Sequence, residues 1–304
     1  MDTELSKHII FHSTSRDGWG SAALLVATLG VDQCEVYPTV LSRDLLAGLG
    51  RDPLPTPEQK PWVLDLAVPG KWPKYDPPGQ RVTWVDHHLS SWRSAPPHWV
   101  HAVLPPDTQP SSSMSLLLRS ELARVPQGQQ LMQRLFSEAD DPWGLVFDGL
   151  YNPGDMPFTW DDLPELIAPA ALGAPVPKRL SFAIEAALHQ RAVVADLLAA
   201  CPIEEHPGML VTHVRDSRFI SHKPFHRALA GRFPGRVIVI VWQRALTCTR
   251  DPGAAGLDFI AHFEARGARV TGHPYACMVW PSRPVRHELQ ALAAQLAARA
   301  ESEV

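Results

Sequence analysis

The sequence lacks the features that would direct a protein to a membrane or out of the cell. No apolar run reaches the roughly 18 residues that a membrane-spanning helix needs. Residues 1–13 contain no basic stretch followed by an apolar one, so we expect no secretion signal. The four cysteines are far apart and form no CxxC pair, which argues against a structural zinc site. A reducing cytoplasm is the simplest compartment, and no membrane partner is expected.

An excess of positive charge is also missing. The 28 Lys and Arg residues are outnumbered by 32 Asp and Glu residues, giving a net charge of −4 and a pI of about 6.4. This balance argues against a stable complex with duplex DNA and against a polybasic membrane binder. A nucleotide substrate stays open, because bound metal ions can supply positive charge. The apolar and charged fractions, 45% and 20%, are those of a globular protein.

Short apolar runs alternate with helical stretches in the first half of the chain. Continuous apolar character suits strands buried on both faces of a parallel sheet. The strand candidates are residues 7–13, 34–40, 61–68, 81–88 and 98–104. The helix candidates are residues 17–30, 111–125 and 127–140. This alternation predicts βαβ units and an α/β domain with a mostly parallel sheet flanked by helices.

The second half begins with a change of character. Residues 151–176 are rich in proline and predict an irregular connection, and residues 178–200 predict a long helix that could join two domains. The alternation then resumes and predicts a smaller α/β domain. Its strand candidates are 208–214 and 236–243, its helices 222–233, 256–267 and 285–303, and 269–280 reads as a loop leading into a strand. We place the domain boundary at about residue 175, which separates residues 1–175 from residues 176–304.

Acidic and imidazole groups lie at the ends of several strand candidates. His12 ends the first, Asp17 begins the next helix, Asp65 interrupts 61–68, and Asp86-His87-His88 ends 81–88. Ligands of open α/β sheets bind beyond the carboxyl ends of the strands, so these groups are expected in one crevice. Oxygen and imidazole ligands together suit Mn²⁺ or a similar divalent ion. A shared carboxylate can hold two such ions about 3.5–4 Å apart for phosphoryl chemistry.

Each of these residues also has a simpler explanation. A histidine such as His12 at a strand end is more often a hydrogen-bonded structural residue, and Asp17 alone could cap a helix. Asp65 is harder to explain in this way, because its apolar neighbours predict burial, and a buried carboxylate needs a partner. The tripeptide Asp86-His87-His88 after an apolar strand is the most specific local signal.

Together these segments resemble the DHH phosphoesterase superfamily, which is named for its Asp-His-His motif. The four motifs of the first domain are matched by HSTSRDGWGSA (12–22), VLDLA (63–67), VDHH (85–88) and EADDPWG (138–144). The arginine-bearing strand and the glycine-rich turn of the associated C-terminal domain are matched by RALTCTRDP (244–252) and TGHPYACM (271–278). The resemblance implies a DHH catalytic domain in residues 1–175, and a linker helix with a substrate-binding domain of mixed sheet in residues 176–304.

The resemblance also implies a centre of two Mn²⁺ ions, with Mg²⁺ or Co²⁺ as alternatives. Asp65 would bridge both ions, and His12 would bind one of them. Asp17, His87 and Asp141 would bind the other.

The fourth motif leaves a choice of ligand. Asp141 is preferred because it directly precedes Pro-Trp, Asp140 is its close rival, and Asp148 is a more distant third. In the third motif, Asp86 would orient an imidazole, and His88 would face the substrate phosphate or assist the attacking water.

In the C-terminal domain, the resemblance implies that Arg250, Gly272 and His273 hold the substrate's phosphate or base. Two positions depart from the family pattern. Ser15 stands where many members have a second aspartate, so the metal site of His12 is expected to be weaker. The segment 267–273 has fewer glycines than usual, which affects the expected orientation of the substrate.

The sequence therefore predicts a Mn²⁺-dependent phosphodiesterase that acts on short oligonucleotides from the 3′ end, or on linear or cyclic dinucleotides. A metal-activated water would be the nucleophile. One alternative is another phosphohydrolase of the superfamily, such as a pyrophosphatase or a nucleoside-bisphosphate phosphatase. A second alternative is a degenerate, non-catalytic nucleotide-binding protein. The substrate's base and polarity stay open, and a homodimer is allowed.

Overall fold

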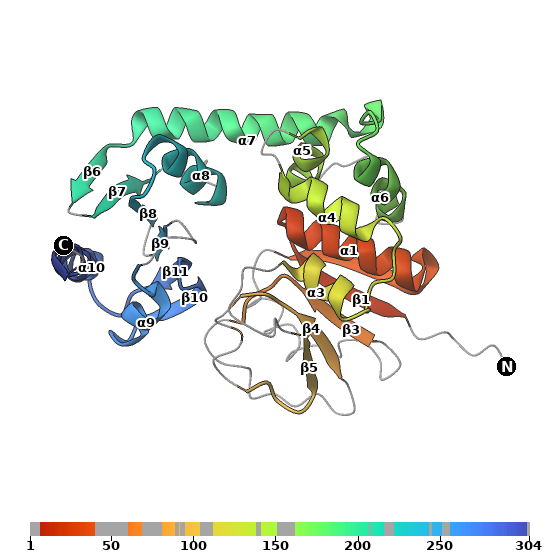
Figure 1. Cartoon of the computed structure of the whole chain (residues 1–304), viewed down its shortest axis with the longest axis horizontal. Coiled ribbons are helices and arrows are strands. Elements are labelled where there is room, and N and C mark those ends of the chain that lie inside the picture. The colour runs from red at the N-terminus through yellow and green to blue at the C-terminus, as the bar shows by residue number, and fades with distance from the viewer. Residues whose placement is uncertain are drawn as a thin grey trace. The chain divides into compact units, whose positions relative to one another are not determined.

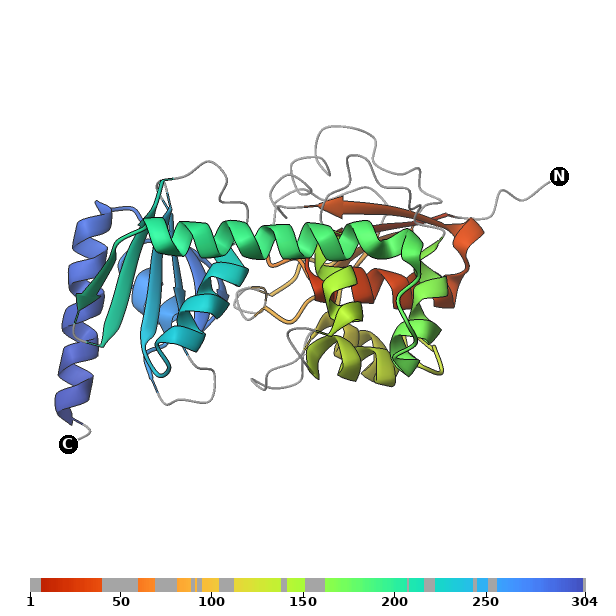
Figure 2. The same cartoon turned by 90° about the horizontal axis from the view of Figure 1, so that it is seen from above.

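The computed structural model divides the chain into two compact units, residues 1–188 and residues 189–304. The structure describes residues 7–39, 60–68, 81–88, 91, 95–103, 112–137, 141–150, 162–206, 208–215, 222–242, 245–250 and 256–302. Asp140 and residues 151–161 of the proline-rich segment lie outside these ranges. The division falls inside helix α7 (Ser181–Ala200), which Figure 2 shows as one continuous helix. The domain boundary near residue 175 stays a prediction.

The N-terminal unit is built on a sheet of five parallel strands in the order β2-β1-β3-β4-β5. The strands are β1 (His8–Ser13), β2 (Cys34–Thr39), β3 (Lys60–Leu64), β4 (Val82–Val85) and β5 (Val100–Val103). This confirms the predicted parallel α/β sheet. The predicted runs overshoot β3 and β4, because Asp65 and Asp86-His87-His88 follow these strands and are not part of them.

Helix α1 (Arg16–Leu29) follows β1 and lies beside the sheet (Figure 1). Its buried face contributes many residues to the core. Ser15 caps its start and Gly30, with φ of 95°, ends it, close to the predicted bounds. Trp19, Leu24 and Leu25 are fully buried. The described helices that follow along the chain are α3 (Ser113–Arg119), α4 (Gly128–Ser137), α5 (Pro142–Gly149) and α6 (Leu163–Leu172).

Two of these helices are absent from the sequence prediction. Helix α5 begins at the fourth motif, with Asp141 as its cap and Pro142 in its first turn. Helix α6 lies within the proline-rich segment, which was wrongly expected to be irregular throughout. Pro164 stands in its first turn, where the missing N–H costs nothing, and Gly173 ends it in the left-handed conformation. Pro169 lies inside the helix, so this segment is helical despite an interior proline.

The C-terminal unit contains a mixed sheet of six strands in the order β10-β11-β9-β8-β7-β6, in which β7 and β8 are the parallel pair. The strands are β6 (Ile203–His206), β7 (Met209–Val214), β8 (Val237–Trp242), β9 (Ala245–Thr249), β10 (Arg269–His273) and β11 (Ala276–Trp280). The helices are α8 (His222–Arg232), α9 (Phe259–Glu264) and α10 (Val285–Ser302). The mixed sheet was predicted, but residues 269–280 form a hairpin instead of a loop and a strand. No helix in the described ranges is long and apolar enough to cross a bilayer.

Candidate metal centre

The predicted ligands converge because of the strand order. Strands β1, β3 and β4 are adjacent and parallel, so their carboxyl ends lie along one edge of the sheet. The chain passes from β1 to β2 on one side and continues with β3 on the other, which makes the β1–β3 boundary a topological switch point. Ligands of open α/β sheets bind at this place. His12 lies near the carboxyl end of β1, and Asp65 and Asp86 directly follow β3 and β4, so all three are at this edge of the sheet.

The turn from β1 into α1 positions Asp17. Ser15 caps the helix by accepting a hydrogen bond from the N–H of Gly18 at 3.1 Å. A Cβ on Gly18 would lie 2.1 Å from the carbonyl oxygen of Ser13, so only glycine allows the helix to approach the strand this closely. The Asp-Gly pair of the first motif thus places Asp17 in the first turn of α1, beside the end of β1.

The carboxylate of Asp17 lies at the start of a second helix. Its oxygens accept hydrogen bonds from the N–H groups of Ser113 (2.7 Å) and Met114 (3.0 Å) in α3. Burial and the negative charge of Asp65 raise the pKa of Asp17 to about 6, against the opposing effects of His87 and the two N–H donors. Two buried carboxylates that repel each other in this way favour a cation between them.

Asp65 directly follows β3 with a left-handed backbone, at φ of 55°. Its N–H continues the sheet by donating to the carbonyl of Val85 at 3.0 Å. One carboxylate oxygen, Oδ1, lies 3.0 Å from Nε2 of His87. The other, Oδ2, accepts hydrogen bonds from the hydroxyls of Ser13 and Ser15. These partners account for the burial of a carboxylate in an apolar run.

His87 completes a group of three potential ligands. Its Nε2 lies 3.0 Å from Oδ1 of Asp65 and 3.6 Å from Oδ2 of Asp17. One ligand atom from each of these residues lies within 4.8 Å of the other two. Burial lowers the pKa of His87, but the hydrogen bond to Asp65 and the charges of Asp65, Asp17 and Asp86 outweigh burial and raise it to about 9. The site therefore attracts positive charge strongly.

Asp86 holds the second histidine of the motif. Its Oδ1 lies 2.7 Å from Nδ1 of His88, and its Oδ2 accepts from the hydroxyl of Ser91 at 2.5 Å. Ser91 in turn accepts from the N–H of Val68 at 2.9 Å. Burial raises the pKa of Asp86, but the charge and hydrogen bond of His88, with His87 and Ser91, prevail and lower it. Because a carboxylate only accepts, Nδ1 of His88 is the donor in this hydrogen bond.

His12 is fully buried against Trp19, with the two ring centres 4.4 Å apart. Its Nδ1 donates to the carbonyl of Ser13 at 2.7 Å, which leaves a lone pair on Nε2. Within the described residues, this buried Nε2 has no hydrogen-bond partner. Burial lowers the pKa of His12 to about 4, more than the Ser13 carbonyl and Asp65 raise it, so the ring is neutral. A neutral, buried and unpartnered imidazole nitrogen fits a metal ligand.

Asp141, the predicted ligand from the fourth motif, caps helix α5 and lies beside an arginine. Its Oδ1 caps α5 by accepting from the N–H groups of Trp143 (3.0 Å) and Gly144 (3.2 Å). Its Oδ2 lies 2.6 Å from Nε of Arg134. Among the described residues, Asp141 belongs to none of the groups of converging ligand atoms. Its metal role stays a prediction. Asp148, the third choice, pairs with Arg16.

The predicted substrate-binding residues all belong to the C-terminal unit. Nε of Arg250 donates to the carbonyl of Leu257 at 3.3 Å. Gly272 has φ of 124°, and a Cβ there would lie 2.4 Å from the carbonyl oxygen of Ala276, so the hairpin requires glycine. The ring of His273 stacks on that of Tyr275 at 5.1 Å. The role of Arg250, Gly272 and His273 in substrate binding stays a prediction.

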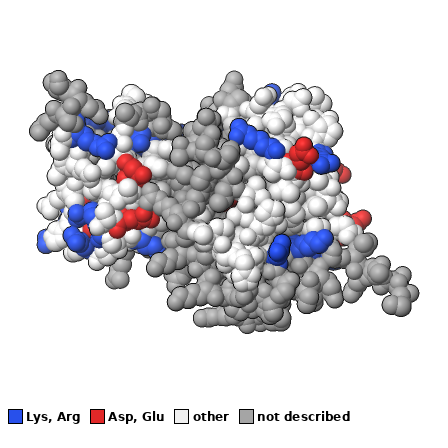
Figure 3. All heavy atoms as spheres, turned by 60° about the horizontal axis from the view of Figure 1, so that its bottom comes forward, with Lys and Arg blue, Asp and Glu red and all other residues white. Residues whose placement is uncertain are grey.

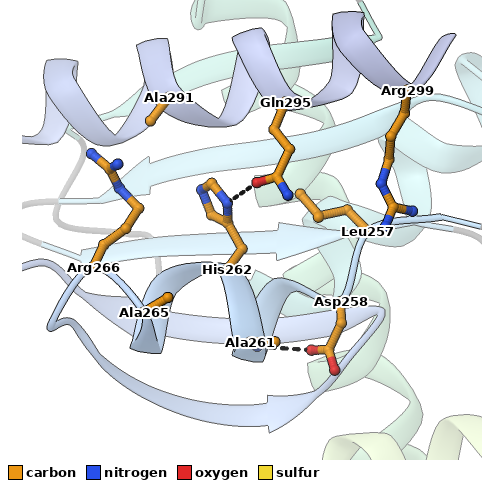
Figure 4. A pocket seen from close by; sticks show the side chains of 9 residues that line it. All are labelled: Leu257, Asp258, Ala261, His262, Ala265, Arg266, Ala291, Gln295 and Arg299. Atoms are coloured by element: carbon orange, nitrogen blue, oxygen red, sulfur yellow. Dashed lines mark hydrogen bonds between the residues drawn. The ribbon is translucent and has the colours of Figure 1, made fainter. Parts of the chain in front are cut away.

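The C-terminal unit also has a cavity of about 470 Å³ between α9 and α10 (Figure 4). His262 points into it and pairs with Gln295. None of the residues singled out from the sequence lines this cavity. On the face drawn in Figure 3, the described Lys and Arg residues form no continuous band, and acidic residues lie among them.

Sequence reasoning missed the residues that support the ligands. Ser13 and Ser91 hold Asp65 and Asp86 through side-chain hydrogen bonds, yet an isolated serine carries no recognisable signal. Ser112 caps α3, the helix that receives Asp17, with a reciprocal bond to Ser115. The sequence does signal this cap, through the serine run before an apolar stretch.

No family model matches the chain, and no curated protein matches it significantly. Several solved structures do match the chain. One is a DHH domain described as a member of a family of ribosomal proteins, with 14% identity and a TM-score of 0.58, covering 97% of this chain and 87% of that one. The chain has the fold of the DHH proteins. A second structure with the DHH fold, the exonuclease RecJ bound to manganese, has 14% identity and a TM-score of 0.52, with 97% and 91% coverage.

RecJ from Thermus thermophilus in complex with Mn²⁺ is also similar, with 15% identity and a TM-score of 0.50. The match covers 99% of this chain and 52% of that longer one. At identities this low, the structural matches show a shared DHH fold alone. The chemistry of the present chain therefore has to come from its own residues.

Proposed function

We propose that the protein is a divalent-metal-dependent phosphodiesterase of the DHH superfamily, with Mn²⁺ as the preferred ion and short oligonucleotides or dinucleotides as substrates. The observation that carries this proposal is the convergence of Asp17, Asp65 and His87, whose ligand atoms lie within 4.8 Å of one another at the switch point of the sheet. A carboxylate–imidazole set of this kind suits Mn²⁺. The buried lone pair of His12 supports the same assignment.

A bound divalent ion would offset the charge of a phosphate group and lower the pKa of a coordinated water. The protein's own residues would hold and orient the side chains that bind the ion and face the substrate. Asp17 is fixed by the α3 N–H groups, and Asp65 by the hydroxyls of Ser13 and Ser15. Asp86 fixes the tautomer of His88, so that Nε2 of His88 can accept a proton from water or, once protonated, contact a phosphate oxygen.

The substrate class follows from charge and from the resemblance. The net charge of −4 does not favour binding of long nucleic acids. This charge supports a short substrate, whose phosphate groups would be neutralised mainly by the ion at the site.

The test is hydrolysis of 5′-phosphorylated di- to pentanucleotides, cyclic dinucleotides and pyrophosphate, with Mn²⁺ or with EDTA. We expect mononucleotides in the Mn²⁺ samples alone. Asp65→Asn keeps the size of the side chain and tolerates the positive φ, yet removes the ligand charge. It should lower turnover by about a hundredfold or more, because a lost ligand costs several kcal/mol. The matched control is Asp32→Asn, at an exposed aspartate outside the site.

The outcomes separate the alternatives. Release of phosphate from pyrophosphate, with the oligonucleotides left intact, would indicate another phosphohydrolase of the superfamily. Nucleotide binding without hydrolysis of any substrate would indicate a degenerate binding protein. Turnover by Asp65→Asn above a tenth of the wild-type rate would contradict the metal centre described above.

A further inference from the structure

The two carboxylate oxygens of Asp65 have different surroundings. Oδ1 faces the imidazole of His87 at 3.0 Å. Oδ2 faces two neutral hydroxyls, those of Ser13 and Ser15. A carboxylate that bridges two ions presents one oxygen to each of them. Here the second oxygen is occupied by hydrogen-bond donors from the chain itself.

The hydroxyl of Ser15 already accepts one hydrogen bond and donates another. It accepts from the N–H of Gly18 at 3.1 Å, which caps α1, and it donates to Oδ2 of Asp65. It also lies 2.9 Å from the hydroxyl of Ser13. Binding an ion through Ser15 would therefore cost the helix cap or the bond to Asp65. A neutral hydroxyl is also a weak ligand for a hard cation compared with a carboxylate.

The charges near the centre match one divalent ion. Asp17 and Asp65 both lie close to Nε2 of His87, at 3.6 and 3.0 Å. Asp65, Asp86 and His88 also bring ligand atoms within 4.8 Å of one another. In that group both oxygens of Asp86 already have partners, Oδ1 in His88 and Oδ2 in Ser91, and outside it Asp141 pairs with Arg134. Among the residues that the structure describes, the carboxylates of Asp17 and Asp65 thus face the position at which a divalent ion would bind. A second ion would have to be held against a net positive charge.

We propose that this centre binds one divalent ion tightly, through Asp17, Oδ1 of Asp65 and His87. Ser13 and Ser15 take the place of the carboxylate that a second ion would need. His12 and Oδ2 of Asp65 form the remnant of that second position, where the described residues offer too few ligands to fill it. This inference rests on the proposed function and departs from the two ions that the family resemblance implies.

The test is the number of Mn²⁺ ions per chain in the full-length protein. Metal-free protein is titrated with Mn²⁺, passed through a desalting column and analysed for bound metal, and its low-temperature electron paramagnetic resonance spectrum is recorded. We expect one ion per chain and the spectrum of an isolated Mn²⁺. Ser15→Asp should raise the content to two ions and give the spectrum of a spin-coupled pair. Aspartate is as good a helix cap as serine, so this variant should keep the fold.

Ser15→Ala is the matched control, because it removes the hydroxyl without adding a ligand, and it should stay at one ion. Two ions with a coupled spectrum in the wild type would overturn the inference and leave the proposed function standing. A Ser15→Asp variant that is folded by circular dichroism but still binds one ion would overturn the role given to Ser15. No bound Mn²⁺ in the wild type would overturn the inference and the proposed function together.

Discussion

The close approach of α1 to β1 at Gly18 gives a sharp prediction. A Cβ at this position would lie 2.1 Å from the carbonyl oxygen of Ser13 and 2.5 Å from its hydroxyl oxygen. Gly18→Ala therefore forces the helix away from the strand by about an ångström, since a real contact needs more than 3.0 Å. Asp17, the preceding residue, moves with the helix.

The size of the effect follows from two opposing contributions. Overpacking of this kind costs about 1–3 kcal/mol, and here the clash is with backbone, which cannot rotate away. Alanine gains about 1 kcal/mol over glycine inside a helix, but the first turn realises only part of it. We expect a net loss of about 1–2 kcal/mol in the free energy of unfolding. The displaced Asp17 should also weaken Mn²⁺ binding at least tenfold, the equivalent of about 1.4 kcal/mol.

The assays are urea denaturation of the metal-free protein and calorimetric titration with Mn²⁺. Gly231→Ala is the matched control. This glycine lies in α8, and a Cβ there meets nothing within 4 Å. It should stabilise the protein by up to about 1 kcal/mol and leave Mn²⁺ binding unchanged. A Gly18→Ala variant with wild-type stability and affinity would refute the view that this approach positions Asp17.

Three further predictions concern packing, pH and tautomer. Gly149→Ala places a Cβ 1.7 Å from a backbone carbonyl of α7, so urea denaturation should show a loss of about 3 kcal/mol or more, with Mn²⁺ affinity kept in the folded fraction. In the metal-free protein, protonated His87 stabilises the fold fully below its ordinary pKa of 6.5 through Asp65 and Asp17. This stabilisation, at most about 3 kcal/mol, is lost as the pH rises through about 9, and His87→Gln should flatten that part of the stability–pH curve. Asp86→Asn should lower kcat by about ten- to a hundredfold while the Mn²⁺ content stays constant, which metal analysis beside steady-state kinetics would check.

The parts of the fold that were predictable have a strong local pattern. Apolar runs marked the strands of the parallel sheet, because strands buried on both faces need little else. Polar residues at the ends of these runs marked the site, since a carboxylate such as Asp65 or a His-His pair after a buried strand has few structural explanations. Helix α6 is not predicted from the sequence, because its prolines indicate a helix break. In the structure Pro164 stands in the first turn, where it costs no hydrogen bond, and the helix also accommodates Pro169 in its interior.

The rest depends on contacts between distant segments. Nothing near Asp141 in the sequence indicates that Arg134 of the preceding helix pairs with it. Likewise, the hydroxyl of Ser13 reaches Asp65 only because β1 and β3 are neighbours in the sheet. A family motif suggests which residues bind metal, but the partners that claim their remaining oxygens belong to this chain alone.

The hydrogen bonds from α3 to Asp17 make this helix a sensor of the site. The amide protons of Ser113 and Met114 are bound directly to the carboxylate that would hold the ion. Any change in the charge of that carboxylate alters the shielding of these two protons and their rate of exchange with solvent. The protein thus contains two natural spectroscopic probes, through which occupancy by a diamagnetic ion such as Mg²⁺ can be followed.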